Sequence, residues 1–501
     1  MTVSQHCPAP GPGVIVSISP AFPAFSSSVA PTKNPLVARY TLVPPIGSRV
    51  RVEYGLSTLY GRSTCEYPAP LGGGPLSILV AGMLPGSQYH MRAVIRLADG
   101  GTRDEPGQTF TTGSLPAQGI PTLVVNSPGI PCPGVELVNM NPQNPIVCDL
   151  EGNIIWFYYN ETDLAQHGHP MPIRTLPNGN MMALITNRYT GHPKPYCVLR
   201  EVDLASETVT NEYGLREIHM DVLNERLQNI TTPFGRTVHV NYFSHDFWPM
   251  PNGHVILLCQ EFVTVDINGQ PTLVWGDALV DLDEKFDPVW VWSIFDVLDV
   301  NRHPFLWEPD HDWTHCNTIE ATPDGNLMLS VRNQSWVLKI DYANGTGSGK
   351  ILWKLGFEGD FELLDSGPAN WFYAQHFPHI LETQGNNITA ITVVDNGNYR
   401  PGTDPPPFSR GLIVLLNETD KLARVAWQFP ISPSYFSYWG GDVVQLPNGN
   451  MEICMSHPTP EHSTATEVSY ADRKIVWQME IHPSAAYRSY RIPSLYPGVQ
   501  W

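Results

Sequence analysis

The sequence predicts an all-β fold, in which a small N-terminal β-sandwich precedes a six-bladed β-propeller. Three observations lead to this prediction. Short apolar runs alternate with turn residues through the first 115 residues. A hairpin phrase then recurs at regular intervals along the rest of the chain. The 41 Gly and 48 Pro are spread along the whole chain, as expected where turns separate many short strands.

Residues 13–115 are predicted to form the sandwich. Six alternating apolar runs are separated by Pro, Gly and Asp at intervals of about 10 residues: VIVSIS, LVARYTLV, RVRVEYGL, LSILVAGM, HMRAVIRL and QTFTTG. This spacing is typical of an all-β sandwich. The stretch LVAGMLPGSQYHMRAVIRLADG resembles a fibronectin type III domain, in which an L-P-x-x-x-Y corner precedes a strand. The segment LPAQGIP, 115–121, is the predicted linker.

The remainder, 122–501, is predicted to be the propeller because it repeats one phrase. Pro, then Asn or Asp, then Gly precede an apolar strand in LPNGNMMALI (176–185), MPNGHVILLC (250–259), TPDGNLMLSV (322–331) and LPNGNMEICM (446–455). A degenerate copy, LETQGNNITAITVV, covers 381–394. Each Asn-Gly or Asp-Gly pair supplies the positive φ that a tight hairpin turn requires.

The spacing of these copies gives the number of blades. Each copy is followed by a second hairpin whose last strand ends near a Trp, and successive copies lie about 60 to 75 residues apart. This is the size of a four-stranded blade with its loops. Five units are visible, and IVCDLEGNIIWFYY (146–159) supplies the closing half of a sixth. The two ends of the chain are therefore expected to pair and close a six-bladed ring.

Charge and hydropathy exclude several classes of partner. The formal net charge of -19 argues against nucleic acid, because phosphate binding needs a basic surface. An anionic substrate then requires a local cluster of Arg and His. No apolar stretch reaches the roughly 18 residues that span a bilayer. The N-terminus shows neither the basic nor the apolar region of a signal peptide, so the sequence alone allows the cytoplasm or export with the signal omitted.

The eight Cys include no CxxC pair, so the sequence indicates no cysteine metal site. Cys132 and Cys148 flank a predicted hairpin and could form a disulfide. Buried free thiols are the favoured interpretation. We predict neither a bound metal nor a cofactor.

Four polar residues are the candidate catalytic groups. His245 and His315 precede copies of the hairpin phrase, Arg332 follows one, and His376 lies in WFYAQHFPHIL before the degenerate copy. Equivalent positions in neighbouring propeller blades point to the same central channel. We therefore expect three imidazoles and one guanidinium to converge. The alternative for each His alone is a buried histidine that is satisfied by backbone hydrogen bonds.

Five further residues are expected near the same channel. Asp395 and Asn396 in VVDNGNYR, with Arg410 after them, lie where the next blade begins and would supply a carboxylate or another anion contact. A plain turn explains Asp-Asn-Gly equally well. Trp371 and Tyr373 could stack against an aryl ring, although such aromatic runs more often pack in a core.

In order and spacing, these motifs resemble those of the bacterial arylsulfate sulfotransferases. The matching sets are H-D-F-x-x-x-P-N-G, D-W-x-H-x-N, S-x-R-x-Q-S-x-x-x-K-I-D, and Q-H-x-x-x-I with a later V-x-D-N-G-N. The resemblance covers nearly the whole chain, because that family also has a β-sandwich before a six-bladed propeller. It implies transfer of a sulfuryl group from an aryl sulfate donor to a phenolic acceptor, without phosphoadenosine phosphosulfate.

By resemblance, His376 is the nucleophile that becomes transiently sulfated, while His245, His315 and Arg332 hold the sulfuryl oxygens. The chemistry agrees, because a neutral imidazole is a good nucleophile and, once sulfated, a good leaving group, which gives a two-step ping-pong mechanism. Arg stays charged, and its planar donors match a tetrahedral oxyanion. One of His245 and His315 should exchange a proton with the phenol oxygen, and the sequence does not say which.

Two other functions stay open. A metal-dependent hydrolase or lyase could use the three His as ligands, although Arg332 would repel a metal ion. A non-catalytic propeller that binds a protein or a glycan is the second alternative. The resemblance also favours a periplasmic or extracellular location, since those relatives are exported, and an exposed sandwich edge could support a homodimer. Some relatives carry two close Cys before the nucleophile, whereas 355–375 contains none.

Overall fold

The protein is all-β, as predicted. The computed structural model describes residues 27–159, 168–188, 194–304, 311–364, 367–381, 388–402, 407–430, 436–456, 462–483 and 485–501. Within these ranges the only α-helix is α2 (Met220–Leu227), and it is too short to span a membrane. The named strands pair antiparallel there except β28 (Glu362–Leu363), which runs parallel to β32 (Leu422–Phe429).

The N-terminal part of the chain forms two sheets. One contains β1 (Ser28–Pro31), β2 (Ala38–Leu42) and β6 (Leu76–Val80). The other is built on β3 (Arg49–Gly55) and β7 (Gln88–Arg96), with the short strands β4 (Arg62–Ser63), β5 (Tyr67–Pro68), β8 (Thr102–Asp104) and β9 (Gln108–Thr111). Alternate residues of both sheets are buried in one apolar cluster. This alternation is expected for strands with one face on a core.

The predicted corner before a strand is present in this part of the chain. The Tyr89 Oη, from β7, accepts a hydrogen bond of 3.0 Å from the backbone N–H of Leu84. This contact ties the turn to the strand that follows it. Five of the six predicted apolar runs form β2, β3, β6, β7 and β9. The first run, 14–19, lies outside the described residues.

Apart from the two-stranded sheet of β17 (Thr210–Asn211) and β18 (Gly214–Leu215), the rest of the described chain contains six sheets, each with a set of four antiparallel strands. The first sheet contains β14 (His169–Thr175), β15 (Met181–Thr186), β16 (Cys197–Val202) and β19 (Glu217–His219). The second contains β20 (Tyr242–Pro249), β21 (Val255–Ile267), β22 (Gln270–Leu282) and β23 (Pro288–Ser293). The third contains β24 (Cys316–Ala321), β25 (Leu327–Val331), β26 (Trp336–Ile340) and β27 (Ile351–Gly356). The fourth sheet contains β29 (His376–Leu381), β30 (Ile388–Asp395), β31 (Arg410–Asn417) and β32. The fifth contains β33 (Asp442–Gln445), β34 (Met451–Met455), β35 (Ser463–Val468) and β36 (Ile475–His482).

The sixth sheet joins the two ends of this region. The last strand, β37 (Ala485–Ile492), pairs with β11 (Val135–Asn141), which is followed by β12 (Ile146–Cys148) and β13 (Ile154–Phe157). An additional strand, β10 (Thr122–Asn126), pairs with the outer edge of β36. The predicted pairing of the two chain ends is therefore confirmed.

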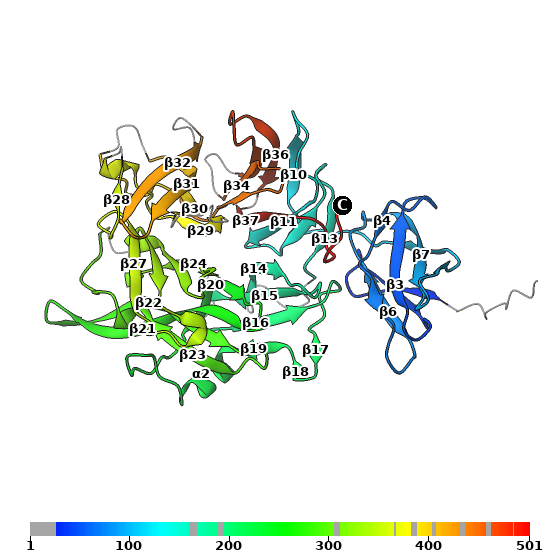
Figure 1. Ribbon diagram of the computed structural model, residues 1–501, viewed down its shortest axis with the longest axis horizontal. Helices are drawn as coiled ribbons and strands as arrows, with labels where there is room; N and C mark the ends of the chain where they lie inside the picture. The colour runs from blue at the N-terminus through cyan, green and yellow to red at the C-terminus, as the bar shows by residue number, and fades with distance from the viewer. Residues whose placement is uncertain are drawn as a thin grey trace, which may run out of the picture.

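The six sheets surround a common centre (Figure 1). Their innermost strands contact one another in turn, from β14 to β20, β24, β29, β33 and β37, and β37 contacts β14 again. The two N-terminal sheets lie to one side of this ring (Figure 1). Side chains from all six innermost strands can therefore face the same central space.

The repeated phrase forms the turn between the first and second strands of its sheet in all four clear copies. The Gly of each copy has a φ between 81° and 88°: Gly179, Gly253, Gly325 and Gly449. In three copies the Asn side chain accepts a hydrogen bond of 3.0–3.1 Å from the backbone N–H two residues later. Only Gly adopts such a φ without strain, which explains why the phrase recurs. The turn of the degenerate copy, 382–387, lies outside the described residues.

The segment after β37 attaches the ring to the N-terminal sheets. The Tyr496 Oη donates a hydrogen bond of 2.9 Å to the carbonyl of Leu79 and accepts one of 2.7 Å from the N–H of Ala81. The Trp501 ring lies 4.9 Å from the Arg62 guanidinium. Cys132 and Cys148 are buried free thiols, as expected, and burial raises the pKa of the Cys148 thiol.

Candidate active site

Strand residues of four sheets of the ring, and residues that adjoin the strands of the other two, line one cavity of about 240 Å³. The four candidate catalytic residues are all in its lining: His245, His315, Arg332 and His376. The remaining lining residues are Asn141, Met171, Tyr438, Trp439 and Tyr487. The described lining therefore carries three imidazoles and one guanidinium and no carboxylate, which is the local cluster that an anionic substrate would need in a chain of net charge -19.

β-bulges in the innermost strands turn several of these side chains into the cavity. The pairing register shifts between Phe243 and Phe247 in β20, between His376 and His379 in β29, and at Tyr487 in β37. A bulge breaks the strict alternation of a strand and re-aims a side chain. This explains how strands with buried faces can present polar groups to the centre of the ring.

The backbone at two of the histidines is left-handed. His245 has a φ of 40° and His315 a φ of 48°. A residue other than Gly rarely adopts such a φ, and where it does, the surrounding structure has to hold it there. Both imidazoles are thus held in position by a backbone conformation that an isolated strand would not adopt.

His376 is oriented by a rigid amide. Its Nδ1 lies 2.7 Å from the Asn396 Oδ1. The Asn396 Nδ2 donates hydrogen bonds to the carbonyls of Ser437 (2.8 Å) and Gly440 (3.1 Å), so this amide presents its oxygen to the imidazole. The His376 Nδ1 must therefore carry the proton and donate it to Asn396. The Nε2 then has the free lone pair.

His376 is also held in its neutral form. Its side chain is buried, with only 1% of the residue exposed. Burial and the nearby positive charge of Arg332 lower its pKa well below 6.5, and the hydrogen bond to Asn396 only partly opposes them. A buried, neutral imidazole with a fixed tautomer is well prepared to act as a nucleophile.

His315 is paired with a carboxylate. Its Nδ1 lies 2.6 Å from the Asp312 Oδ2, and the same oxygen lies 3.2 Å from the Arg188 Nη2. Burial alone would raise the pKa of Asp312, but His315, Arg188 and Arg332 lower it to about 2, so the carboxylate stays charged. The Asp312 carboxylate beside Nδ1 holds the orientation of the imidazole and leaves Nε2 available to a ligand in the cavity.

The Nδ1 of His245 lies beside a hydroxyl. Its Nδ1 lies 2.7 Å from the Ser244 Oγ, and its ring centroid lies 4.7 Å from that of His315. Burial, together with the charges of His315 and Arg188, lowers the pKa of His245 well below 6.5. The two histidines that sequence reasoning could not separate thus differ in their environments: His315 has an acidic partner and His245 a hydroxyl.

Arg332 begins the short 3-10 helix η4 (Arg332–Gln334), directly after β25. Only 3% of the residue is exposed, and its Nη1 donates a hydrogen bond of 2.6 Å to the Asn333 Oδ1. Its guanidinium lies 5.5 Å from the Tyr438 ring centroid. A fixed cation in a buried, aromatic-walled cavity attracts an anion more strongly than it would in water.

The aromatic wall of the cavity was not predicted. The rings of Trp439 and Tyr487 are stacked, with centroids 6.3 Å apart, and the Tyr487 ring lies edge-on to His376 at 6.4 Å. Trp439 precedes β33, and Tyr487 is the extra residue at the bulge in β37. The one indication of this wall in the sequence was that Tyr487 lies in the strand that closes the ring.

The five residues expected to contact substrate all lie outside the cavity lining. Trp371 and Tyr373 are buried in an apolar cluster, as the core-packing alternative suggested. Asp395 is buried in ion pairs with Arg400 (2.5 Å) and Arg410 (2.8 Å), and it accepts a hydrogen bond from the Tyr373 N–H. Asn396 contacts the cavity lining through its hydrogen bond to His376. These five residues therefore belong to the structure around the cavity.

A metal-centred site would need ligand atoms that converge. In the described part of the chain, the only three His, Cys, Asp or Glu ligands with atoms within 4.8 Å of one another lie elsewhere, on β36 and directly before β35. The three cavity histidines do not form such a group. Together with Arg332 in the same lining, this arrangement favours binding of an anion at the centre of the ring.

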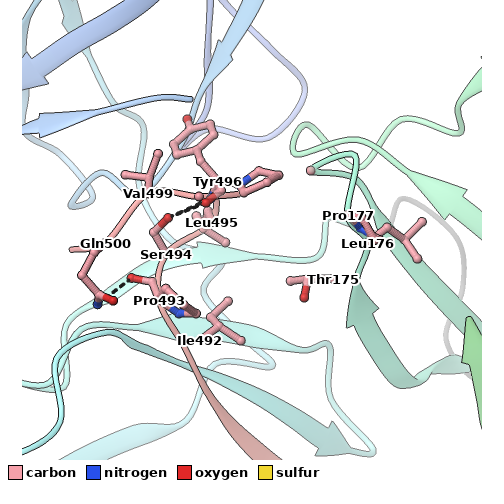
Figure 2. Close-up of a pocket in the computed structure, with 13 residues that line it drawn as sticks. Thr175, Leu176, Pro177, Ile492, Pro493, Ser494, Leu495, Tyr496, Val499 and Gln500 are labelled. Carbon is pink, nitrogen blue, oxygen red and sulfur yellow. Dashed lines mark hydrogen bonds between the residues drawn. The ribbon is translucent and has the colours of Figure 1, made fainter. Parts of the chain in front are cut away.

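A larger cavity, of about 530 Å³, lies elsewhere on the molecule. Figure 2 shows Leu495 and Tyr496, from the segment after β37, opposite Leu176 and Pro177, from the turn between β14 and β15. Its described lining has no charged side chain, and its one phenol, Tyr496, is bonded to the N-terminal sheets. Despite its size, the described lining of this cavity offers no charged group to hold an anionic substrate.

Comparison with known proteins agrees with the motifs. Among solved structures, the chain is similar to a protein from Lactobacillus plantarum (9% identity, TM-score 0.33, covering 71% of this chain and 83% of that one). It is also similar to virginiamycin B lyase from Staphylococcus aureus (10% identity, TM-score 0.31, covering 79% and 91%). These values are too low to support an inference.

No curated protein matches the chain. The family model described as Arylsulfotransferase (ASST), however, matches residues 122–491, which include the whole ring and every residue of the cavity lining. The chain therefore belongs to the arylsulfotransferase (ASST) family.

Proposed function

We propose that the protein transfers a sulfuryl group from an aryl sulfate to a phenolic acceptor by a ping-pong mechanism, with His376 as the nucleophile. Family membership supports aryl sulfotransferase activity. The observation that carries the finer proposal is the orientation of His376, whose Nδ1–H is held by Asn396 so that the Nε2 lone pair is free. Arg332 in the same lining supplies the positive charge that a sulfate ester requires.

In the first step, the His376 Nε2 attacks the sulfur of the donor. An N–S bond forms, the bond from sulfur to the aryl oxygen breaks, and the departing phenolate takes a proton from the His315 Nε2. The sulfated ring keeps its Nδ1–H on Asn396, so it carries imidazolium character and stays a good leaving group. His315 is assigned as the acid because its Nδ1 lies 2.6 Å from the Asp312 carboxylate, which leaves Nε2 to exchange a proton with the phenol oxygen.

In the second step, the acceptor phenol takes the place of the first. The His315 Nε2, now neutral, accepts the phenol proton, the phenol oxygen attacks sulfur, and the N–S bond breaks. His376 regains its lone pair and His315 its proton, so the enzyme returns to its starting state. One site and one proton shuttle therefore serve both half-reactions, as a ping-pong mechanism requires.

Arg332 and His245 hold the sulfuryl oxygens in this proposal. Sulfuryl transfer resembles phosphoryl transfer in having a loose transition state with charge on the oxygens, so catalysis depends mainly on positioning and electrostatics. Arg332 stays charged through both steps. The aromatic groups Tyr438, Trp439 and Tyr487 supply ring faces against which an aryl donor and a phenolic acceptor can pack.

The architecture that we propose for this function is a six-bladed β-propeller over 122–501, preceded by a β-sandwich over 13–115. The closed ring of six four-stranded sheets supports the blade count. The shared apolar cluster of the two N-terminal sheets supports the sandwich. In such a propeller the cavity lies at the centre of the ring, where all blades contribute side chains.

The direct test is the intact mass of the purified protein after brief exposure to p-nitrophenyl sulfate. The wild type should gain about 80 Da, the mass of one sulfuryl group, and lose it when phenol is added. His376→Ala should gain nothing. If neither protein forms the adduct and neither releases nitrophenol, the sulfotransferase proposal is wrong and the central cavity serves another purpose.

The pH dependence of this adduct tests the state of His376. Because the folded-state pKa of His376 lies well below 6.5, its Nε2 lone pair stays available as the pH falls through 6.5. We therefore expect the rate of adduct formation to show no decline assigned to His376 between roughly pH 7.5 and 6, measured by rapid quench and mass analysis. A decline with an inflection near 6.5 would mean that His376 titrates like an exposed imidazole.

A further inference from the structure

Two histidines and a glutamate converge on the fifth sheet of the ring, outside the central cavity. The rings of His462 and His482 are stacked, with centroids 4.6 Å apart and an angle of 29° between their planes. The Glu480 carboxylate spans them, with one oxygen 3.0 Å from the His482 Nε2 and the other 4.0 Å from the His462 Nε2. Their ligand atoms lie within 4.8 Å of one another, and no other such group occurs among the described residues.

The strand register explains why these side chains meet. Ser463 of β35 pairs with Ile481 of β36, so His462 stands opposite His482 across the two strands. Glu480 lies two residues before His482 and therefore projects from the same face of the sheet. Glu480 and His482 are fixed in β36 by backbone pairing, and His462 directly precedes the first paired residue of β35.

The ligand set suits a divalent transition metal. Imidazole nitrogen and carboxylate oxygen bind Zn²⁺ at about 2.0–2.2 Å, and two ligands of a tetrahedral site then lie roughly 3.3 Å apart. The two measured separations, 3.0 and 4.0 Å, bracket this value, so small side-chain rotations suffice to bring the three atoms around one ion. Two His and one carboxylate leave a fourth position for water, and all three side chains are partly exposed, which gives an ion access from solvent.

We propose that His462, Glu480 and His482 form a binding site for a single zinc-class divalent cation. A bound ion would link the ends of β35 and β36. The strand registers from β33 to β36 place this group at the end of the sheet where β33 begins. Trp439, which lines the central cavity, precedes β33 and lies at the same end of the sheet. The ion would thus fasten the sheet at its cavity end.

The protein carries its own control for a simple ion pair. Glu217 and His219 on β19 have the same spacing as Glu480 and His482, and their side chains approach to 3.2 Å with His219 equally exposed, at 36%. The residue across the strand from His219 is Val198, which cannot bind a metal. Glu217 and His219 therefore offer two metal ligands, whereas Glu480 and His482 have His462 beside them as a third.

The test uses the full chain after removal of metals with a chelator. Zn²⁺ is titrated against a chromophoric competitor, and Co²⁺ absorption reports the ligand geometry. The wild type should bind one Zn²⁺, and binding should raise its unfolding temperature. His482→Ala and His462→Ala should each weaken binding at least about tenfold, as expected when a ligand is lost. His219→Ala should bind Zn²⁺ like the wild type.

Three results would overturn the proposal. The wild type could fail to bind a single Zn²⁺ at micromolar concentration, or His219→Ala could weaken binding as much as His482→Ala. Binding could also disappear in His376→Ala, which would assign the ion to the central cavity instead. Unfolding temperatures in the absence of metal show whether each variant is folded, and His482→Cys, which retains a metal ligand, should recover part of the affinity lost in His482→Ala.

Discussion

His376→Ala should reduce the release of nitrophenol from p-nitrophenyl sulfate by roughly 10⁴-fold or more, because removal of a covalent nucleophile removes both half-reactions at once. No other imidazole in the described lining has its Nδ1 fixed by an amide oxygen in the way that Asn396 fixes His376. The measurement is kcat under saturating phenol, with Arg332 and both other histidines intact.

A matched control lies three residues further along the same strand. His379 also belongs to β29, but its Nδ1 lies 3.1 Å from a carboxylate oxygen of Glu320, and it is not in the cavity lining. His379→Ala should keep kcat within about threefold of the wild type, because this side chain lies outside the cavity lining and has no role in the proposed mechanism. Equal losses in the two variants would indicate that β29 is sensitive to any substitution and that His376 has no special role.

The sequence allowed the ring to be predicted because its turns have a strict local requirement. Each Pro-Asn/Asp-Gly phrase encodes a positive φ at one Gly, and local information of this kind survives in a single sequence. The convergence of His245, His315, Arg332 and His376 followed from the repeat, since equivalent positions in successive sheets face one axis. Both predictions used short-range signals and one symmetry argument.

The contacts that decide the chemistry are long-range, and the sequence could not supply them. Asn396 reads as a turn residue, and only the fold brings its amide to His376 and its Nδ2 to two carbonyls beyond β32. Tyr487 lines the cavity because β37 bulges there. Trp371 and Tyr373 could have faced a ligand, although core packing is the more common use of such an aromatic run, and both are buried in an apolar cluster.

His315→Ala should lower the rate by roughly 10² to 10⁴-fold, and the loss should depend on the leaving group. A general acid matters most when the departing phenolate is a strong base. The loss should therefore be small for p-nitrophenyl sulfate, whose phenolate is stabilised by the nitro group, and large for unsubstituted phenyl sulfate. Single-turnover rates of adduct formation with a series of substituted aryl sulfates measure this dependence without interference from the acceptor step.

His245→Ala is the comparison that separates acid catalysis from positioning. His245 faces the same cavity and lies against His315, but its Nδ1 meets the hydroxyl of Ser244, and burial keeps its pKa low, so it is a neutral donor to an oxyanion. Its removal should slow all aryl sulfates by a similar factor. Because Asp312 acts through His315, Asp312→Asn should give the same dependence on the leaving group as His315→Ala, though a weaker one. If the dependence instead follows His245, the proton passes through that histidine, and Asp312 only holds the backbone turn in place.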